Sequence, residues 1–90
     1  PRQVSIVGEV KKPGKYDMPQ EKDITLLEAV AMAEGFTKDA DLKNVKVMRT
    51  EKGEQKTIKI NVKDITVRGE KDKDIVLKAD DVIVVPESFF

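Results

Sequence analysis

Apolar residues recur at every second position near the start of the chain, over residues 4–10, which is typical of a half-buried β-strand. Gly8 shares the face of the apolar side chains, and we interpret it as a place where another backbone or a ring packs closely. Pro13 and Gly14 then predict a type II turn, because proline presets the first central torsion and glycine accepts the positive φ of the second. A short strand over residues 15–18 would complete a hairpin.

A helix is predicted over residues 26–34. Thr25 is a suitable N-cap, and Glu28 stands three residues later, as in a capping box. Gly35 follows as the residue that ends the helix in a left-handed conformation. Helical spacing places four apolar residues on one face, namely Leu26, Leu27, Val30 and Ala33.

The second half of the chain reads as strands joined by short turns. Residues 45–50 predict one strand, and residues 57–63 alternate strictly between apolar and polar side chains. The lysines on the polar face of residues 57–63 indicate an edge strand, because charge there discourages further pairing. A short helical turn over residues 64–67 and a short strand over residues 75–77 follow.

The run Val82-Ile83-Val84-Val85 is apolar on both faces, as in a central strand, and Pro86 ends it. We expect Val82 or Val84 to be fully buried. A hairpin, a helix and then further strands, with the first and last strands parallel in the middle, imply a mixed sheet with one main helix on its face. This α+β arrangement is the β-grasp.

Composition narrows the function of this single domain of 90 residues. Lys plus Arg and Asp plus Glu each count 17, so the basic excess of a nucleic-acid-binding protein is missing. The sequence has no cysteine and no histidine, which excludes thiolate chemistry and removes the usual general base. No apolar run approaches the roughly 20 residues that a membrane helix needs. We therefore expect a soluble domain that is not an enzyme and holds no metal or cofactor.

Four segments in this order resemble the SLBB domain, the soluble-ligand-binding β-grasp of bacterial polysaccharide export proteins. The stretch VSIVGEVKKPGKY, from Val4 to Tyr16, is similar to the first hairpin of that family. TLLEAVAMAEG, from Thr25 to Gly35, is similar to its helix, and Val45-x-Val47-x-Arg49 to its next strand. Leu77 and the stretch from Asp81 to Pro86 resemble its closing strand. The chain departs from the family where Glu34 replaces a glycine and where Asp80 precedes Asp81 in place of Gly-Asp.

The resemblance implies a binding or assembly module of a capsule or exopolysaccharide export protein at the bacterial outer membrane. Its partners would be polysaccharide and other copies or domains of the export protein in a ring, with no nucleic acid. The location would be periplasmic, with attachment to the outer membrane through other parts of the parent protein. We expect residues 1–90 to be one SLBB-type domain cut from such a longer protein, and the domain itself not to span the membrane.

Five residues are candidates for ligand binding. Tyr16 and Phe36 have aromatic faces that can stack on a sugar ring, or both can instead pack against the helix or cap the sheet. Arg49 can hold an acidic sugar through paired hydrogen bonds, or it can form a structural ion pair. Lys11 and Lys12 in the hairpin loop can contact an anionic glycan or partner, or simply be solvated.

Other polar and apolar pairs are read as structural. Asp80 and Asp81 are interpreted as solvated turn residues, and the Asp72-x-Asp74 pair lacks the remaining ligands of a calcium loop. The adjacent Phe89 and Phe90 are expected to be covered, either by this domain or by a following segment. Two alternatives to the export role remain open. The domain can be a purely structural assembly module, or it can bind a soluble cofactor such as cobalamin.

Overall fold

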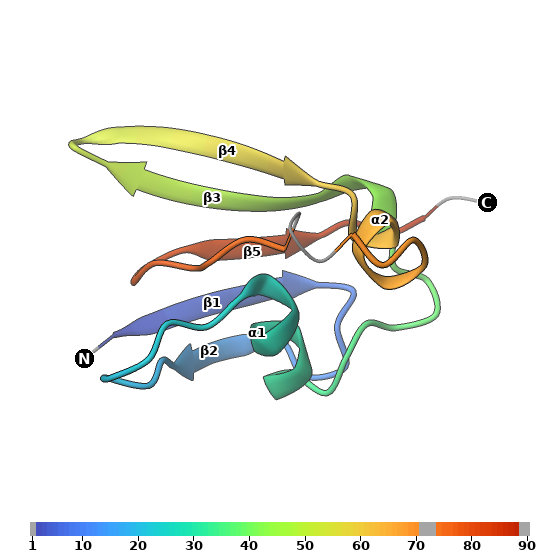
Figure 1. The fold of residues 1–90 in the computed structure, drawn as a ribbon, viewed down its shortest axis with the longest axis horizontal. Helices are drawn as coiled ribbons and strands as arrows, with labels where there is room; N and C mark the ends of the chain where they lie inside the picture. Colours follow the sequence, from blue (N-terminus) through green and yellow to red (C-terminus); the bar gives the residue numbers. More distant parts are fainter. Residues whose placement is uncertain (1, 71–73, 89–90) are drawn as a thin grey trace.

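A computed structural model of the chain describes residues 2–70 and 74–88. The described part holds a five-stranded sheet in the order β2-β1-β5-β3-β4, in which β1 and β5 are parallel and the other neighbours antiparallel. Helix α1 lies over one face of this sheet, and α2 lies at the end of the sheet where β4 ends (Figure 1). Both helices contribute buried residues to the same core. The elements are β1 (Gln3–Gly8), β2 (Gly14–Asp17), α1 (Leu26–Met32), the 3-10 helix η1 (Leu42–Asn44), β3 (Val45–Glu51), β4 (Glu54–Ile60), α2 (Val62–Thr66) and β5 (Val82–Val85).

This arrangement confirms the expected α+β fold, a mixed sheet whose first and last strands are parallel and which carries one main helix. The finer β-grasp assignment stays a prediction from the sequence. The core lies between the covered face of the sheet and the two helices. Its largest fully buried apolar side chains are Ile6, Leu26, Leu77 and Ile83, together with the valines at positions 4, 45, 47, 62 and 85.

Helix α1 begins as the sequence predicts. The Thr25 hydroxyl accepts the Glu28 backbone N–H at 3.3 Å, and the Glu28 carboxylate accepts the Thr25 N–H at 3.1 Å, which completes the capping box. The helix ends earlier than expected, with Ala33 as its C-cap. Glu34 and Gly35 both have positive φ, 66° and 93°, so two residues in succession turn the chain out of the helix.

The loop that joins β1 to β2 is longer than predicted. The proposed tight turn around Pro13 is wrong, because β2 already begins at Gly14 and the antiparallel pairing ends where Ile6 faces Gly14. The intervening loop leaves the sheet instead and docks on the end of α1. Val10 forms an isolated bridge with Phe36 there, so tertiary contacts take the place of a local turn.

The edge position of β4 is confirmed, but the strand ends at Ile60 rather than at residue 63. The side chain of Asn61 accepts a hydrogen bond from the Lys63 N–H at 3.0 Å and so caps α2. Helix α2 corresponds to the helical turn predicted over residues 64–67, but it begins slightly earlier. Val62 therefore enters the core from a helix and not from a strand.

The central position of β5 is confirmed, whereas the expected burial of Val82 and Val84 is wrong. Ile83 and Val85 are the buried residues, while Val82 and Val84 are only half-buried. The reason is that α1 and the core lie on one face of the sheet and leave the opposite face open. Val76 forms an isolated bridge with Thr25, so residues 75–77 do not make the expected strand.

The interpretation of Gly8 is confirmed. A Cβ atom at this position would lie 2.1 Å from the carbonyl oxygen of Val85 on the neighbouring strand. Gly8 also has a φ of 99°, which side-chain-bearing residues rarely adopt. The expectations about Asp72, Phe89 and Phe90 concern residues that lie outside the described ranges.

Candidate functional site

The loop between β1 and β2 brings four of the five predicted ligand-binding residues together. The backbone N–H of Lys11 donates to the Gly35 carbonyl and that of Lys12 to the Ala33 carbonyl, each at 3.0 Å. These bonds occupy carbonyls at the end of α1 that no helical N–H can reach. With the bridge from Val10 to Phe36, they fasten the loop to the helix end. We call Lys11, Lys12, Tyr16 and Phe36 the loop site.

The aromatic residues of the loop site are partly used by the fold itself. Tyr16 faces Val4 across the β1–β2 ladder and packs against the core. Phe36, in the segment after α1, also packs against the core. The Tyr16 hydroxyl donates to the Lys12 carbonyl, so its polar end holds the loop. Both side chains remain half-buried, which leaves part of each available to a ligand.

The charged residues of the loop site differ in their partners. The Lys12 ammonium lies 2.7 Å from the Glu34 carboxylate in an exposed ion pair, a type that contributes about 0–1 kcal/mol. An anionic ligand would therefore compete with Glu34 for Lys12. Lys11 is exposed and has no ion-pair partner among the described residues, so it is the freer of the two cations.

Arg49 is not part of the loop site and forms a buried ion pair with Asp81. Its Nε donates to both carboxylate oxygens at 3.1 and 3.2 Å, and its Nη2 donates to Oδ2 at 2.8 Å. The Asp81 side chain is 1% exposed and the Arg49 side chain 12% exposed. The hydrogen bond with Asp81 raises the pKa of Arg49, so the guanidinium stays charged.

Of the two interpretations of Arg49, the structure thus shows the structural ion pair. A contact of Arg49 with an acidic sugar stays a prediction. The interpretation of Asp81 as a solvated turn residue is wrong, whereas Asp80 is exposed, with a φ of 70°. The sequence held a signal for this pair, because strand alternation over residues 45–50 puts Arg49 on the same face as Val47, where a buried charge needs an anionic partner.

Three carboxylates that are distant in the sequence meet beside the loop site. The ligand atoms of Glu9, Asp39 and Glu87 lie within 4.8 Å of one another, and the Thr37 hydroxyl donates to Glu9 at 2.9 Å. Such a group has the oxygen ligands that a hard cation prefers. Exposed carboxylates also gather without an ion, so the cluster by itself does not define a metal site. Sequence reasoning missed it, because only the fold brings these residues together.

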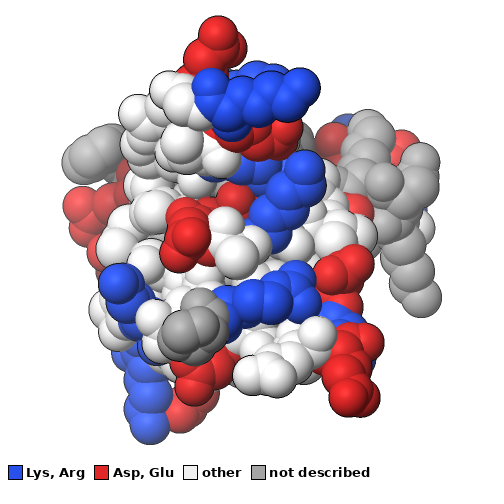
Figure 2. Space-filling model, turned by 90° about the vertical axis from the view of Figure 1, so that its left-hand side faces the viewer, with Lys and Arg blue, Asp and Glu red and all other residues white. Residues whose placement is uncertain are grey.

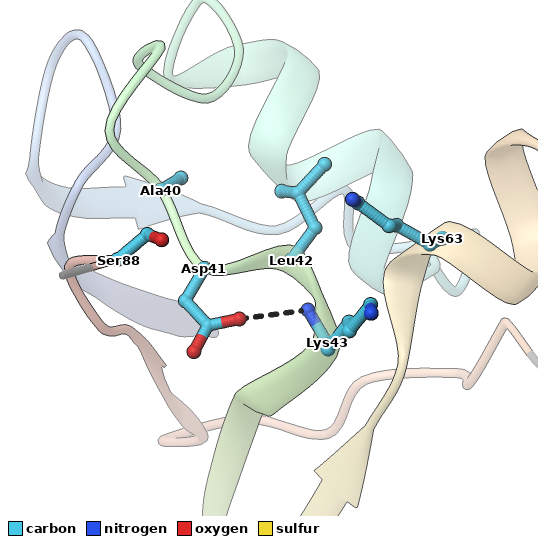
Figure 3. Close-up of a pocket in the computed structure, with 6 residues that line it drawn as sticks. All are labelled: Ala40, Asp41, Leu42, Lys43, Lys63 and Ser88. Atoms are coloured by element: carbon cyan, nitrogen blue, oxygen red, sulfur yellow. Dashed lines mark hydrogen bonds between the residues drawn. The ribbon is translucent and has the colours of Figure 1, made fainter. Parts of the chain in front are cut away.

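A small pocket of about 150 Å³ opens between η1, α2 and the segment after β5 (Figure 3). Its lining is polar at one side, where the Lys43 N–H donates to the Asp41 carboxylate at 3.2 Å. Its volume lies below the roughly 300–1,000 Å³ of pockets for drug-sized ligands. The lining residues are Ala40, Asp41, Leu42, Lys43, Lys63 and Ser88.

Acidic and basic side chains are interspersed on the end of the molecule that carries the β3–β4 turn (Figure 2). The described residues of this end form no continuous basic stripe of the kind that follows a nucleic-acid backbone. Within the ranges that the structure describes, no helix has the length and apolar character needed to cross a membrane.

Two comparisons bear on the identity of the chain. A search of curated proteins finds no match. The family model described as the SLBB domain matches residues 2–85, which span β1 to β5 and include the loop site and the Arg49–Asp81 pair. The match agrees with the resemblance seen in the sequence, and this chain belongs to the SLBB domain family.

Proposed function

We propose that this domain is a non-enzymatic binding and assembly module of a bacterial capsule or exopolysaccharide export protein. The observation that carries the proposal is the SLBB match over residues 2–85. The domain would work in the periplasm, and other parts of the parent protein would attach it to the outer membrane. Its partners are a polysaccharide and neighbouring domains of the export protein.

Among the residues that the structure describes, the two shifted pKa values belong to structural contacts. Perturbed pKa values gather at catalytic sites, where burial and charge tune acids and bases. The pKa of Glu28 is lowered by its hydrogen bond with the Thr25 backbone, and that of Arg49 is raised by Asp81. Both perturbations have structural causes, namely a helix cap and a buried ion pair. The sequence has no histidine to act as a base near neutral pH.

The loop site is the surface on which we place glycan contacts. It combines two half-buried aromatic rings with the exposed ammonium of Lys11. An aromatic face can cover one face of a sugar, and a lysine can pair with a uronate carboxylate. One or two such contacts give little free energy beyond the cost of association, so dissociation constants near the millimolar range are expected.

Nuclear magnetic resonance titration with acidic and neutral oligosaccharides tests this placement. We expect amide shifts centred on Lys11, Tyr16 and Phe36, with Phe36→Ala weakening both sugars and Lys11→Ser weakening only the acidic one. Lys63→Ser is the matched control, because Lys63 is an exposed lysine on α2, at the small pocket and outside the loop site. If no oligosaccharide shifts these amides at high concentration, glycan binding by the loop site is refuted.

The structural assembly role is the second candidate. It is favoured by the internal use of polar groups in the loop site, where the Tyr16 hydroxyl and the Lys12 ammonium already have partners. We expect the isolated domain to be monomeric at micromolar concentration, because a ring would need contacts from several domains to reach typical interface areas. Sedimentation at several concentrations tests this. The pocket in Figure 3, at about 150 Å³, is too small for a cofactor of the size of cobalamin, so it lends no support to the cobalamin alternative.

A further inference from the structure

The face of the sheet opposite the helices carries an apolar block that nothing in the described part of the chain covers. Strand registers place Val7 beside Val84, and Val82 beside Met48. Val7 is 43% exposed, and the other three side chains are half-buried within the sheet. We call these four residues, together with Lys46 and Lys59, the open face. A sheet normally buries the apolar part of each face against another layer.

Two lysines extend the row of Val7 and Val84 across the sheet. Lys46 lies beside Val84 on β3, and Lys59 lies directly opposite Lys46 on β4. Both are exposed, and neither has an ion-pair partner among the described residues. Like charges directly opposite each other destabilise a sheet, so this pair costs free energy in the isolated domain.

The remaining charges on this face do not cancel the two lysines. Lys15 on β2 lies beside Ser5 in the row that continues to Val82. Asp17 accepts a hydrogen bond from Gln3 at 2.8 Å on the far side of the sheet from Lys59. The open face is therefore an aliphatic block whose β3–β4 side is positive.

We propose that the open face binds an amphipathic helix of a partner protein, with aliphatic side chains on the helix packed on the block and acidic side chains paired with Lys46 and Lys59. A helix packed on a sheet is a standard way to bury such a face. Charge complementarity selects an acidic partner, because it relieves the lysine repulsion and favours encounter.

Other occupants fit this face less well. The block contains valine and methionine but no aromatic ring, whereas sugars are usually held by aromatic faces and dense hydrogen bonds. A second copy placed face to face would bring two lysine pairs toward each other. The inference is independent of the proposed function, since the loop site lies at the end of α1.

Two synthetic peptides of 18 residues test the proposal, one with leucines on one helical face and glutamates elsewhere, the other with lysines in place of the glutamates. We expect the acidic peptide to shift the amides of Val7, Met48 and Val84. The basic peptide should bind at least about tenfold more weakly, a difference equivalent to about 1.4 kcal/mol. The preference should shrink as salt is raised.

The variant Lys46→Glu/Lys59→Glu should reverse the preference of the face for the two peptides. Lys43→Glu/Lys63→Glu has the same change in net charge at the small pocket and should leave the preference unchanged. Amide dispersion in the free variants verifies that both are folded.

Equal binding of the two peptides, or shifts confined to other surfaces, would overturn the proposal. It would also be overturned if acidic oligogalacturonate shifted the same amides more strongly than the acidic peptide, which would assign the face to glycan. Shifts of these amides that depend on protein concentration without peptide would assign the face to self-association and equally refute a partner helix.

Discussion

Removing Arg49 is expected to be among the most destabilising single changes in this domain. In Arg49→Met the Asp81 carboxylate would keep the Lys78 N–H at 2.8 Å but lose three hydrogen bonds from the guanidinium. Asp81 is 1% exposed, so in the folded domain its carboxylate depends on protein partners rather than on bulk water. The Arg49 Nη2 also donates to the Val76 carbonyl at 3.1 Å, so the pair fastens the segment before β5 to β3.

Breaking a buried ion pair by removing one partner costs about 3–5 kcal/mol, because the remaining charge is left unpaired. The Arg49 side chain is 12% exposed, so some water reaches its side of the pair and places the expected loss near the lower end, at about 3 kcal/mol. For a domain of this size that loss lowers the melting temperature by roughly 12–24 °C. It moves the urea midpoint by roughly 1–3 M.

Urea and thermal denaturation at neutral pH provide the measurement, and Arg2→Met is the matched control. Arg2 pairs with Asp23 at 3.3 Å with side chains 35% and 68% exposed, so its removal should cost about 0–1 kcal/mol. The double variant Arg49→Met/Asp81→Leu should be more stable than Arg49→Met alone, because no charge is then left buried. A loss in Arg49→Met no larger than in the control, or no recovery in the double variant, would show that the pair is not the structural element described.

Three further outcomes follow from the helix cap and from Gly8. Thr25→Ala should lower the free energy of unfolding by about 1 kcal/mol in urea denaturation, and an unchanged midpoint would place the helix start elsewhere. Because the pKa of Glu28 is lowered from 4.5 in the folded state, Glu28 stabilises the fold above that pH and the contribution is lost as pH falls below it. Glu28→Gln should therefore destabilise at pH 7 and lose its effect in acid; a pH-independent difference would contradict this. Gly8→Ala should destabilise more than Gly53→Ala in thermal melts, because both have positive φ but only the Cβ at position 8 meets the Val85 carbonyl, at 2.1 Å. Equal losses in the two variants would refute close packing at Gly8.

The sequence determined those features that depend on neighbouring residues. The capping box needs only Thr25 and Glu28 at helical spacing, so the start of α1 could be read directly. The strict alternation over residues 57–63 predicted a half-buried strand, and the lysines on its polar face predicted its edge position. The β-branched run over residues 82–85 predicted a central strand, because hydrophobic period and residue type are local properties. The position of Gly8 was also readable, since a glycine among inward-facing residues signals a close approach.

Only the tertiary structure decided which residues meet across the chain. Asp81 reads as a turn residue until β3 places Arg49 beside it, and a buried charge is tolerated there only because that partner is present. The β1–β2 loop does not form the tight turn that Pro13 suggests. Its backbone N–H groups instead donate hydrogen bonds to carbonyls at the end of α1 that would otherwise be unpaired. Burial of one face of β5 and exposure of Val84 on the other depend on which side the helices pack. Alternation within an apolar run cannot reveal that side, because both faces of such a strand look the same in the sequence.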